Sequence, residues 1–463
     1  MKSIQATRGS LPSLLAVSAG FFYVSCANAD LNAVSGMTPV QAPVASTIQT
    51  ICPKMAAQSS SLTAEQQLLL SSCRKLVQTS NGLQHSGPSG QSLGLTESGL
   101  RAALQGVSPE EMNAQNRSRT FAGNAPIGAR LLALRRGAGG GPLASSTFDL
   151  NGQPLLLSEM LPFGSRGGGA SADSGPDGPW SGFVQGHYNW GTRDRSAVED
   201  RFDFHDVGVT AGVDYRFSDS TVAGIALSYA HTKADFDNGL GDVESNNAGV
   251  SLYGSHSFGK AYVEGFVGYT KVDFDSARRI LVPSTTGVSG FDTTAKGSTN
   301  ADQFTASIAT GYDWSRDSMT ITPFVRLSYA HLGIDGFTER ESRSSLGLDV
   351  KSRSVNSLQS AIGAQITKAI SVQSGVISPY AAIEWNHEFQ NNNENIVAKY
   401  THDPFNTFFT IPTAHPDRDY FTLRAGLTSV FPSGVSAFAN LDTVVGLRDT
   451  TSTSLTVGVR LEF

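Results

Sequence analysis

The side chains most often used in catalysis are present in this chain, but their spacing forms no recognisable site. Ser174 lies in the segment Asp173-Ser174-Gly175-Pro176, and Ser165 lies in Gly164-Ser165-Arg166-Gly167. Both serines are in a stretch rich in glycine, serine and proline, and neither has the spacing of a nucleophile elbow. The nine histidines are scattered, and none has the H-x-x-x-H spacing of a metal site. We therefore predict no enzymatic activity, no catalytic residue, no metal and no cofactor.

The first 29 residues have the order of a secretory signal peptide. Lys2 and Arg8 give a positive start, a mostly apolar stretch follows over 11–24, and Ala27-Asn28-Ala29 forms an A-x-A cleavage site. Cys26 would allow a lipoprotein signal instead, but Tyr23 stands where such signals usually have leucine. Ordinary cleavage after Ala29 is the favoured interpretation, and it places the mature chain outside the cytoplasm.

The two cysteines that remain after cleavage, Cys52 and Cys73, can form a disulfide in an oxidising compartment. Thr63 to Gln66 forms a capping box and predicts a helix from there to about Val77. Apolar residues before it predict a second helix, and the disulfide would join the two into a hairpin. The expected buried positions on the two helices are Ile48, Ile51, Cys52, Met55, Leu69, Cys73 and Leu76.

Composition divides the rest of the chain. Residues 30–178 contain no Trp or Tyr, whereas all four Trp and eleven of the twelve Tyr lie from Pro179 onward. We assign residues 30–137 to a short helical passenger or periplasmic region, 138–178 to a Gly/Ser/Pro-rich linker, and 179–463 to a second domain.

The second domain alternates apolar and polar residues with a period of two, which is typical of β-strands. Leu455, Val457, Val459, Leu461 and Phe463 alternate with polar residues or glycine up to the last position. About twelve such strands can be counted. They include Val207–Phe217, Phe304–Trp314 and Phe421–Leu427, and others start near 180, 222, 248, 261, 321, 358, 379 and 435.

Two features favour a transmembrane barrel over a soluble sandwich or propeller. Aromatic residues gather at strand ends, as in the interfacial girdles of outer-membrane barrels. Connections alternate between tight turns and long polar loops near 191–203, 232–243, 272–300, 332–355 and 390–419. The fold class that we predict is an all-β transmembrane barrel of about 12 antiparallel strands, with a small mainly α-helical N-terminal region.

The alternation also predicts which charged residues face the barrel interior. An even-stranded barrel has both of its ends on the tight-turn side, so the helical region either stays there or threads the lumen. Ser108-Pro109-Glu110-Glu111 is a second capping box, and a helical stretch could follow to Arg136. Gly123 and Pro126 interrupt this stretch, so it is either one kinked helix or two helices. Its arginines suit a lumen with acidic groups, and a solvated helix is the alternative. The lumen-facing polar residues that we predict are Arg216, Glu264, Arg326, Glu384, Arg424 and Arg460.

Residues 180–463 resemble the C-terminal translocator domain of autotransporters, the type V secretion proteins. The stretches that carry the likeness are Gly208–Phe217, Leu327-Ser328-Tyr329, Asp419–Leu427 and Val457–Phe463. The resemblance implies a twelve-stranded barrel with a helix in its pore and a passenger exported through it. It also implies that Val459, Leu461 and the terminal Phe463 form the signal read by the barrel-assembly machinery.

The function that we predict is an outer-membrane translocator that anchors and exports or displays its own short N-terminal passenger. An anchored or plugged pore, or a surface-adhesion barrel with long extracellular loops, is the alternative. An enzyme would need a role for Ser165 or Ser174. Expected partners are outer-membrane lipid, the barrel-assembly machinery and, as one option, host or neighbouring-cell surfaces; nucleic acid is not expected. We expect the outer membrane of a Gram-negative bacterium, with the N-terminal region at the cell surface or in the periplasm.

Overall fold

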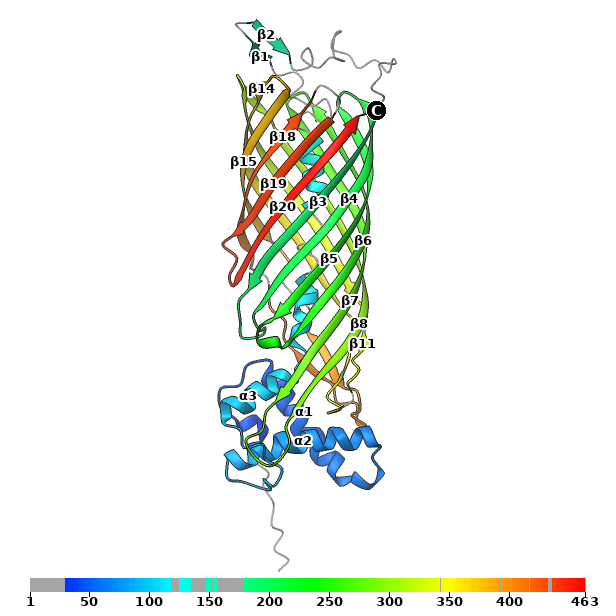
Figure 1. Cartoon of the computed structure of the whole chain (residues 1–463), viewed down its shortest axis with the longest axis vertical. Helices are drawn as coiled ribbons and strands as arrows, with labels where there is room; N and C mark the ends of the chain where they lie inside the picture. The colour runs from blue at the N-terminus through cyan, green and yellow to red at the C-terminus, as the bar shows by residue number, and fades with distance from the viewer. Residues whose placement is uncertain are drawn as a thin grey trace, which may run out of the picture.

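Twelve long strands form a closed antiparallel barrel in the computed structural model, among the residues that it describes. These residues are 30–117, 125–134, 147–150, 153–156, 179–341, 343–390, 394–415, 417–431 and 435–462. Each barrel strand pairs with its neighbours in sequence, and β20 closes the barrel against β3, with Val459 opposite Val184. The predicted fold class is confirmed (Figure 1).

The barrel strands are β3 (Trp180–Arg193), β4 (Phe202–Ser218), β5 (Thr221–Phe236), β6 (Gly241–Phe258), β7 (Ala261–Val282), β8 (Phe291–Tyr312), β10 (Met319–Ile334), β13 (Arg353–Lys368), β15 (Gly375–Glu388), β18 (Asp419–Val430), β19 (Val435–Val445) and β20 (Thr450–Glu462). The shorter strands are β9 (Trp314–Arg316), β14 (Ile370–Val372), the pair β1 (Thr147–Leu150) and β2 (Gln153–Leu156), and the small sheet of β11 (Phe337–Thr338), β12 (Leu348–Val350), β16 (Ile396–Tyr400) and β17 (Phe409–Ile411).

The outer face of the barrel carries an apolar band. Leu227 is 65 % exposed and Ile308 is 56 % exposed, which a soluble sheet would bury. Aromatic side chains border the band: Trp180, Phe217 and Trp314 lie outward near the tight turns, and Tyr229, Tyr269 and Trp385 lie outward toward the other end. This arrangement is the one expected where an apolar band contacts lipid and aromatic rings lie at its two interfaces.

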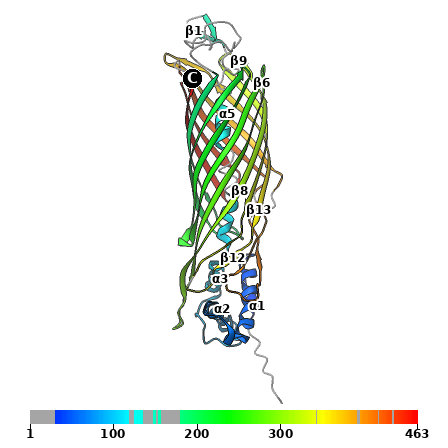
Figure 2. The ribbon, with the colours of Figure 1, turned by 90° about the vertical axis from the view of Figure 1, so that its right-hand side faces the viewer.

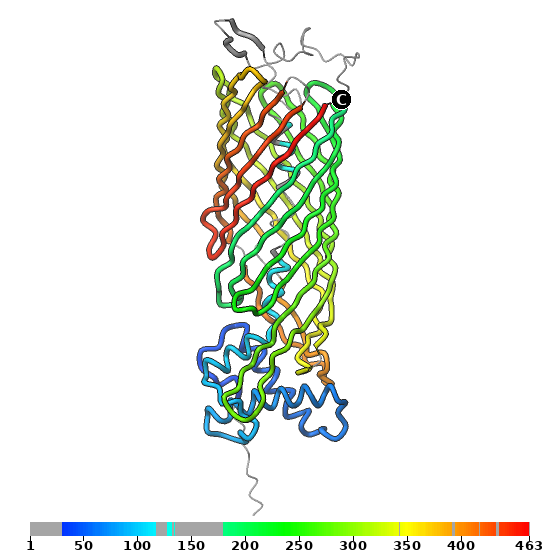
Figure 3. Tube along the Cα trace, in the orientation of Figure 1, coloured from blue at the N-terminus to red at the C-terminus, as the bar shows by residue number. Residues whose placement is uncertain are grey.

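Several strands extend well past this band, so the predicted long loops were partly wrong. β7 continues from Tyr269 to Val282, and β8 already begins at Phe291, which leaves only a short loop where 272–300 was expected. The expectation failed because Lys271, Asp273 and Asp275 face outward there, so the apolar alternation stops although the strand does not. Figure 3 shows the resulting hairpin reaching beyond the barrel mouth.

The helical region lies at this extended end, opposite the end where β3 begins and β20 finishes (Figures 1 and 2). We call these the loop end and the turn end. The helices are η1 (Leu31–Ala33), α1 (Gln41–Ala57), η2 (Ser59–Ser61), α2 (Ala64–Leu83), α3 (Glu97–Gly106), η3 (Glu110–Arg117) and α5 (Ala125–Ala133), and a short η6 (Asp237–Gly239) joins β5 to β6.

The local signals at α1 and α2 are confirmed. Thr63 caps α2 by accepting from the Gln66 backbone N–H, and the Gln66 side chain accepts from the Thr63 backbone, as in a capping box. α2 runs past the expected end at Val77 to Leu83. Cys52 and Cys73 form the disulfide that joins the two helices, with their Cα atoms 5.8 Å apart.

The apolar core of the helical region includes side chains from the barrel's connections. Ile48 and Leu69 of the helices belong to the same buried cluster as Ile396 and Ile411 of the small sheet and Ile280 of β7. The segment 390–419, expected to be a polar loop, therefore supplies core residues. Because the helical region has so few aromatic side chains of its own, these contacts complete a core that it could not build alone.

The tip of the β7–β8 hairpin also forms hydrogen bonds with the segment that links α2 to α3. The Thr285 backbone N–H donates to the Leu93 carbonyl at 2.8 Å, and its hydroxyl donates to the Gly94 carbonyl at 2.8 Å. Gly94 has φ +66°, and a Cβ atom there would lie 2.4 Å from Thr285 Oγ1. Glycine is thus required twice, by the backbone conformation and by the close approach of the hairpin.

Replacing both cysteines with alanine should destabilise the helical region and leave the barrel intact. The disulfide closes a loop with a sequence separation of 21, and a loop of that size is worth about 3 kcal/mol. Thermal loss of helical circular dichroism would measure the effect. A reducing agent should lower the wild-type midpoint similarly and leave the double variant unchanged; equal midpoints in all samples would contradict a stabilising role.

Candidate functional site

The lumen of the barrel is occupied by the chain itself. α5 lies inside the barrel toward the turn end, as Figure 2 shows, and η3 contacts β6 and β7 nearer the loop end. Since the helical region lies beyond the loop end and β3 starts at the turn end, the chain passes through the lumen. Of the two arrangements that the sequence left open, the structure has the threaded one.

Arg130 of α5 makes the central contact in the lumen. Its side chain is fully buried and forms an ion pair with Asp214 of β4, with Nε 3.4 Å from Oδ1 and Nη2 on Oδ2. Asp214 also accepts from Ser181 at 2.9 Å and from the Tyr253 hydroxyl. The Arg130 guanidinium lies 4.7 Å from the centre of the Phe183 ring. A charge this deep is tolerated only where it is paired and hydrogen-bonded, as it is here.

The wall under α5 is apolar, which the sequence reasoning missed. Ile127 and Leu131 pack on a patch made of inward side chains. Gly212 leaves room for this patch, because a Cβ atom there would lie 2.5 Å from Phe183 Cε1. The patch breaks the rule of polar-in, apolar-out that guided the expectation. Its members on the wall are Phe183, Val222, Ala226, Tyr253 and Phe266.

The opposite wall is polar and borders a cavity of about 230 Å³ beside α5. Arg326 donates to Glu384 at 2.8 Å, and Arg424 donates to Asp442 at 2.6 Å. The structure places four of the predicted lumen residues around this cavity: Glu264, Arg326, Glu384 and Arg424. The lumen therefore has an apolar side that seats the helix and a charged side that stays open.

The remaining predicted residues lie near the turn end. Arg216 donates to Glu462 at 3.0 Å, and Arg460, 4 % exposed, donates to Ser181 at 2.9 Å and also contacts Glu462. Val459 and Leu461 of the expected assembly signal lie on the outer face, 44 % and 54 % exposed, while Phe463 lies outside the described residues. Their role in assembly stays a prediction.

Arg353, at the start of β13, holds η3 in the lumen. Its guanidinium donates to the Met112 carbonyl at 3.1 Å, to Asn116 Oδ1 at 3.1 Å and to Gln115 Oε1 at 2.5 Å. The side chain is 4 % exposed. Arg353 thus donates to three acceptors of the buried η3 segment. These hydrogen bonds lower the free-energy cost of burying the three acceptor groups.

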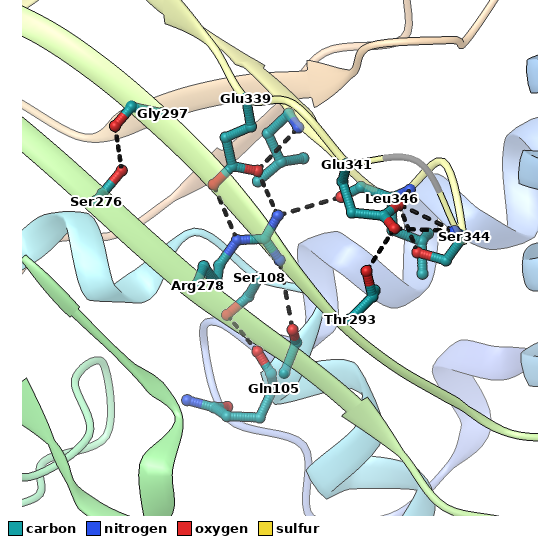
Figure 4. Close-up of polar contacts among 12 residues, drawn as sticks. Gln105, Ser108, Ser276, Arg278, Thr293, Gly297, Glu339, Glu341, Ser344 and Leu346 are labelled. Atoms are coloured by element: carbon teal, nitrogen blue, oxygen red, sulfur yellow. Dashed lines mark hydrogen bonds and ion pairs between the residues drawn. The ribbon is translucent and has the colours of Figure 1, made fainter.

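Arg278 of β7 forms the corresponding anchor at the loop end (Figure 4). It pairs with Glu339 through Nε at 3.1 Å and donates to the carbonyls of Gly106, at the end of α3, and Leu346. Glu339 accepts in turn from the Leu348 backbone N–H at 3.0 Å. A single buried arginine therefore joins the helical region, the extended strand and the small sheet.

Glu341 organises the adjoining connection, which is also drawn in Figure 4. It accepts from the Thr293 hydroxyl at 2.7 Å and from the Ser344 hydroxyl at 2.8 Å, as well as from backbone N–H groups of the connection. Burial alone would raise its pKa, but these hydrogen bonds to the carboxylate outweigh burial and lower the pKa. Arg278 and Arg353 were missed because both fell in segments expected to be loops.

Two buried glutamates, Glu110 and Glu111, are the first residues of η3. Glu110 is 1 % exposed and accepts from Gln105, and Glu111 is 5 % exposed. Burial, together with Asp200 and Glu199 of the β3–β4 connection, raises the pKa of Glu110. Burial likewise raises the pKa of Glu111 to about 8, although Arg278 opposes this shift. The first two residues of η3 thus carry buried carboxyl groups that favour their protonated form.

Other sequence expectations turned out differently or lie outside the described residues. Ser108 donates to the Gln105 carbonyl at 2.8 Å, which places its side chain at the end of α3 rather than in the expected box. The described elements after it are a 3₁₀ helix, η3, and the helix α5, in keeping with a helical stretch divided near Gly123 and Pro126; residues 118–124 lie outside the described residues. Ser165, Ser174 and the signal segment 1–29 are not described. Within the described residues, no group of three or more His, Cys, Asp or Glu side chains is arranged to hold a metal ion.

Glu111→Gln should stabilise η3 in its buried position in the lumen at high pH. The seated state keeps the Glu111 proton up to about pH 8, whereas a released segment loses it near its ordinary value of 4.5. Seating therefore weakens as the pH rises between these values, and by up to a few kcal/mol. Urea titrations followed by helical circular dichroism at about pH 5 and about pH 9 would measure the difference.

The variant should resemble the wild type at the lower pH and exceed it at the higher one. Glu97→Gln, on the exposed face of α3, is the matched control and should leave the profile unchanged. A wild-type midpoint that rises with pH would refute this account.

Comparison with known proteins assigns this chain to a family. The family model described as "Autotransporter beta-domain" matches residues 182–442, more than half of the chain. Outer membrane protein A of Rickettsia rickettsii is 28 % identical over 38 % of this chain and 8 % of its own length. An extracellular serine protease of Serratia marcescens is 25 % identical over 43 % of this chain and 18 % of its own. The chain thus spans less than a fifth of these relatives.

Solved structures with similar barrels include the translocator domain of autotransporter NalP from Neisseria meningitidis. It is 17 % identical with a TM-score of 0.49, over 62 % of this chain and 89 % of that one. The beta domain of the Bordetella autotransporter BrkA is 14 % identical with a TM-score of 0.45, over 62 % of this chain and all of that one.

No helix among the described residues is both long enough and apolar enough to cross a membrane. The family match runs along the barrel from β3 into β19 and ends before β20, the strand that closes the barrel. The protein belongs to the autotransporter family, and its barrel is a translocator of the Gram-negative outer membrane.

Proposed function

We propose that this barrel exports residues 30–117 of its own chain and displays them on the cell surface, held at the loop end. The observation that carries the proposal is the position of the chain on either side of the lumen. The helical region lies beyond the loop end, η3 and α5 follow inside the barrel, and β3 begins at the turn end. In outer-membrane barrels the short turns face the periplasm and the long connections face outward. The helical region is then outside the cell, and it is the passenger.

The passenger is unlike a long β-helix. The described part of residues 30–117 is helical, and its outer surface carries both signs of charge, so neither its composition nor its shape identifies a ligand. An adhesive role toward host or neighbouring cells stays a proposal. Ser165 and Ser174, on which a hydrolytic role would depend, lie outside the described residues.

The structure favours display with the pore closed over an open channel. Buried contacts hold the chain at three levels. Arg130 of α5 pairs with Asp214 and Arg353 binds η3 within the lumen, and Arg278 holds the end of α3 at the loop end. A chain seated in this way closes the route that it took.

An epitope tag inserted after Asp30 should be lost when intact cells are treated with an external protease. The tag would lie on the helical region, beyond the loop end. The same tag inserted in the β6–β7 turn between Gly259 and Lys260 is the matched control, because that turn lies at the turn end. Protection of the first tag until the outer membrane is permeabilised would place the helical region in the periplasm and refute export.

Arg130→Gln should make the closed pore leaky. The substitution removes the charge that pairs with buried Asp214, and Arg460, at 3.9 Å, replaces it only in part. Breaking one side of a buried pair costs a few kcal/mol, enough to release α5 for part of the time. Planar-bilayer recordings should show brief openings that the wild type lacks. Arg316→Gln, exposed on β9, is the control, and identical traces for wild type and Arg130→Gln would exclude a closing role for the pair.

A further inference from the structure

We propose that the α1–α2 hairpin binds the surface connections of the barrel as a non-covalent subunit would, so that cutting the chain behind it does not release it. The inference rests on the proposed export, since it concerns what holds the exported region. It specifies the partner of the interface: residues 30–90 of this same chain, docked on the small sheet, the β7–β8 hairpin and α3.

The interface is apolar at its centre. Side chains from α1 and α2 share one buried cluster with side chains from β12, β16 and β17. Ile396, Tyr400 and Ile411 are all completely buried, although they lie in connections that would otherwise face water. These connections would expose a contiguous apolar patch without the hairpin, and such patches are covered in stable proteins.

Polar contacts surround this apolar centre. The buried Ser72 hydroxyl of α2 donates to the Ser344 carbonyl at 2.8 Å, and Lys75 donates to the Ser289 carbonyl at 2.9 Å. The Lys75 ammonium also lies 5.2 Å from the centre of the Phe291 ring, and Lys54 of α1 lies 5.7 Å from that of Phe405. An apolar centre with a polar rim is the usual anatomy of a stable protein–protein interface.

The hairpin is also a self-contained piece. The Cys52–Cys73 disulfide fixes α1 to α2, so that a cut after α2 leaves both helices on one fragment. The loop behind α2 is exposed from Gly87 to Gln91, and at Gly90 an added Cβ atom would meet no other atom within 4 Å. This loop can therefore accept an inserted sequence without disturbing the interface.

The rest of the helical region does not depend on this loop for its attachment. Leu93 and Gly94 are hydrogen-bonded to Thr285, and Arg278 holds the end of α3 through the Gly106 carbonyl. The α1–α2 hairpin in turn contacts this anchored half through Gln41 and Gln105, 3.0 Å apart, and through Arg101, which donates to the Ser35 carbonyl. After a cut at Gly90, every one of these contacts remains possible.

The test uses the full chain in intact cells, with a site for a sequence-specific protease inserted after Gly90 and a tag after Asp30. After external cleavage, we expect most of the tagged fragment to stay with the washed cells, because an interface with an apolar centre and a polar rim holds it. Release of most of the fragment into the medium would overturn the inference. Absence of any cleavage would instead mean that the region was never exported, which is a failure of the proposed function and not of the interface.

Variants in β17 identify the interface as the cause of retention. Ile411→Asp puts a charge into the apolar centre and should lower retention after cleavage roughly tenfold. Thr410→Asp, on the exposed face of the same strand, is the matched control and should retain the fragment like the wild type. Equal retention in both variants would show that this sheet is not the binding surface.

A second measurement applies even if Ile411→Asp does not assemble. Washing cleaved wild-type cells with increasing urea should elute the tagged fragment while the barrel, followed by its heat-dependent mobility on gels, stays folded. The uncleaved protein should lose no tag under the same washes. Elution by buffer alone would overturn the inference.

Discussion

The arrangement of this molecule depends on the polar contacts that allow a polypeptide segment to remain inside the barrel lumen. A chain in a lumen has backbone and side-chain groups that neither lipid nor bulk water can satisfy, and each unpaired group would carry a large penalty. Here the wall supplies the partners. Arg130 finds Asp214, and Arg353 supplies donors to Met112, Gln115 and Asn116. These contacts determine where the helical region lies, because they fix the direction in which the chain leaves the barrel.

The height of the barrel is the second constraint. From Tyr269 at the edge of the apolar band, β7 runs on to Val282, which corresponds to roughly 30 Å along the barrel axis for a tilted strand. The hairpin of β7 and β8 is therefore a stalk that keeps the helical region clear of the membrane surface. Its outer face is polar, since water rather than lipid surrounds it, and its inner face carries Ile280 into the core of the helical region.

Local periodicity and capping made several elements predictable from the sequence, whereas elements decided by a tertiary contact were missed. The alternation in Val207–Phe217 identified a barrel strand, and Thr63 identified the start of α2. The same alternation cannot reveal that Phe183 and Phe266 face inward to seat α5, because the rule assumes a polar lumen. Nor can composition show that Ile396 and Ile411, within an apparently polar loop, complete another region's core. Their burial depends on helices more than 300 residues earlier in the chain.

If the helical region is exported as proposed, the core that it shares with the barrel's connections makes its folded state depend on its location. Under the proposed function, α1 and α2 find Ile396, Tyr400 and Ile411 only at the loop end, after passing the barrel. Before that point, the region has no aromatic core of its own, and the apolar area that it can bury is too small to offset the entropy of ordering its chain. Its stable state therefore exists on one side only, and moving back would require the separation of a buried interface and of the arginine contacts within the lumen. Under the proposed function the native state is available only outside the cell, and folding there makes the passage effectively one-way.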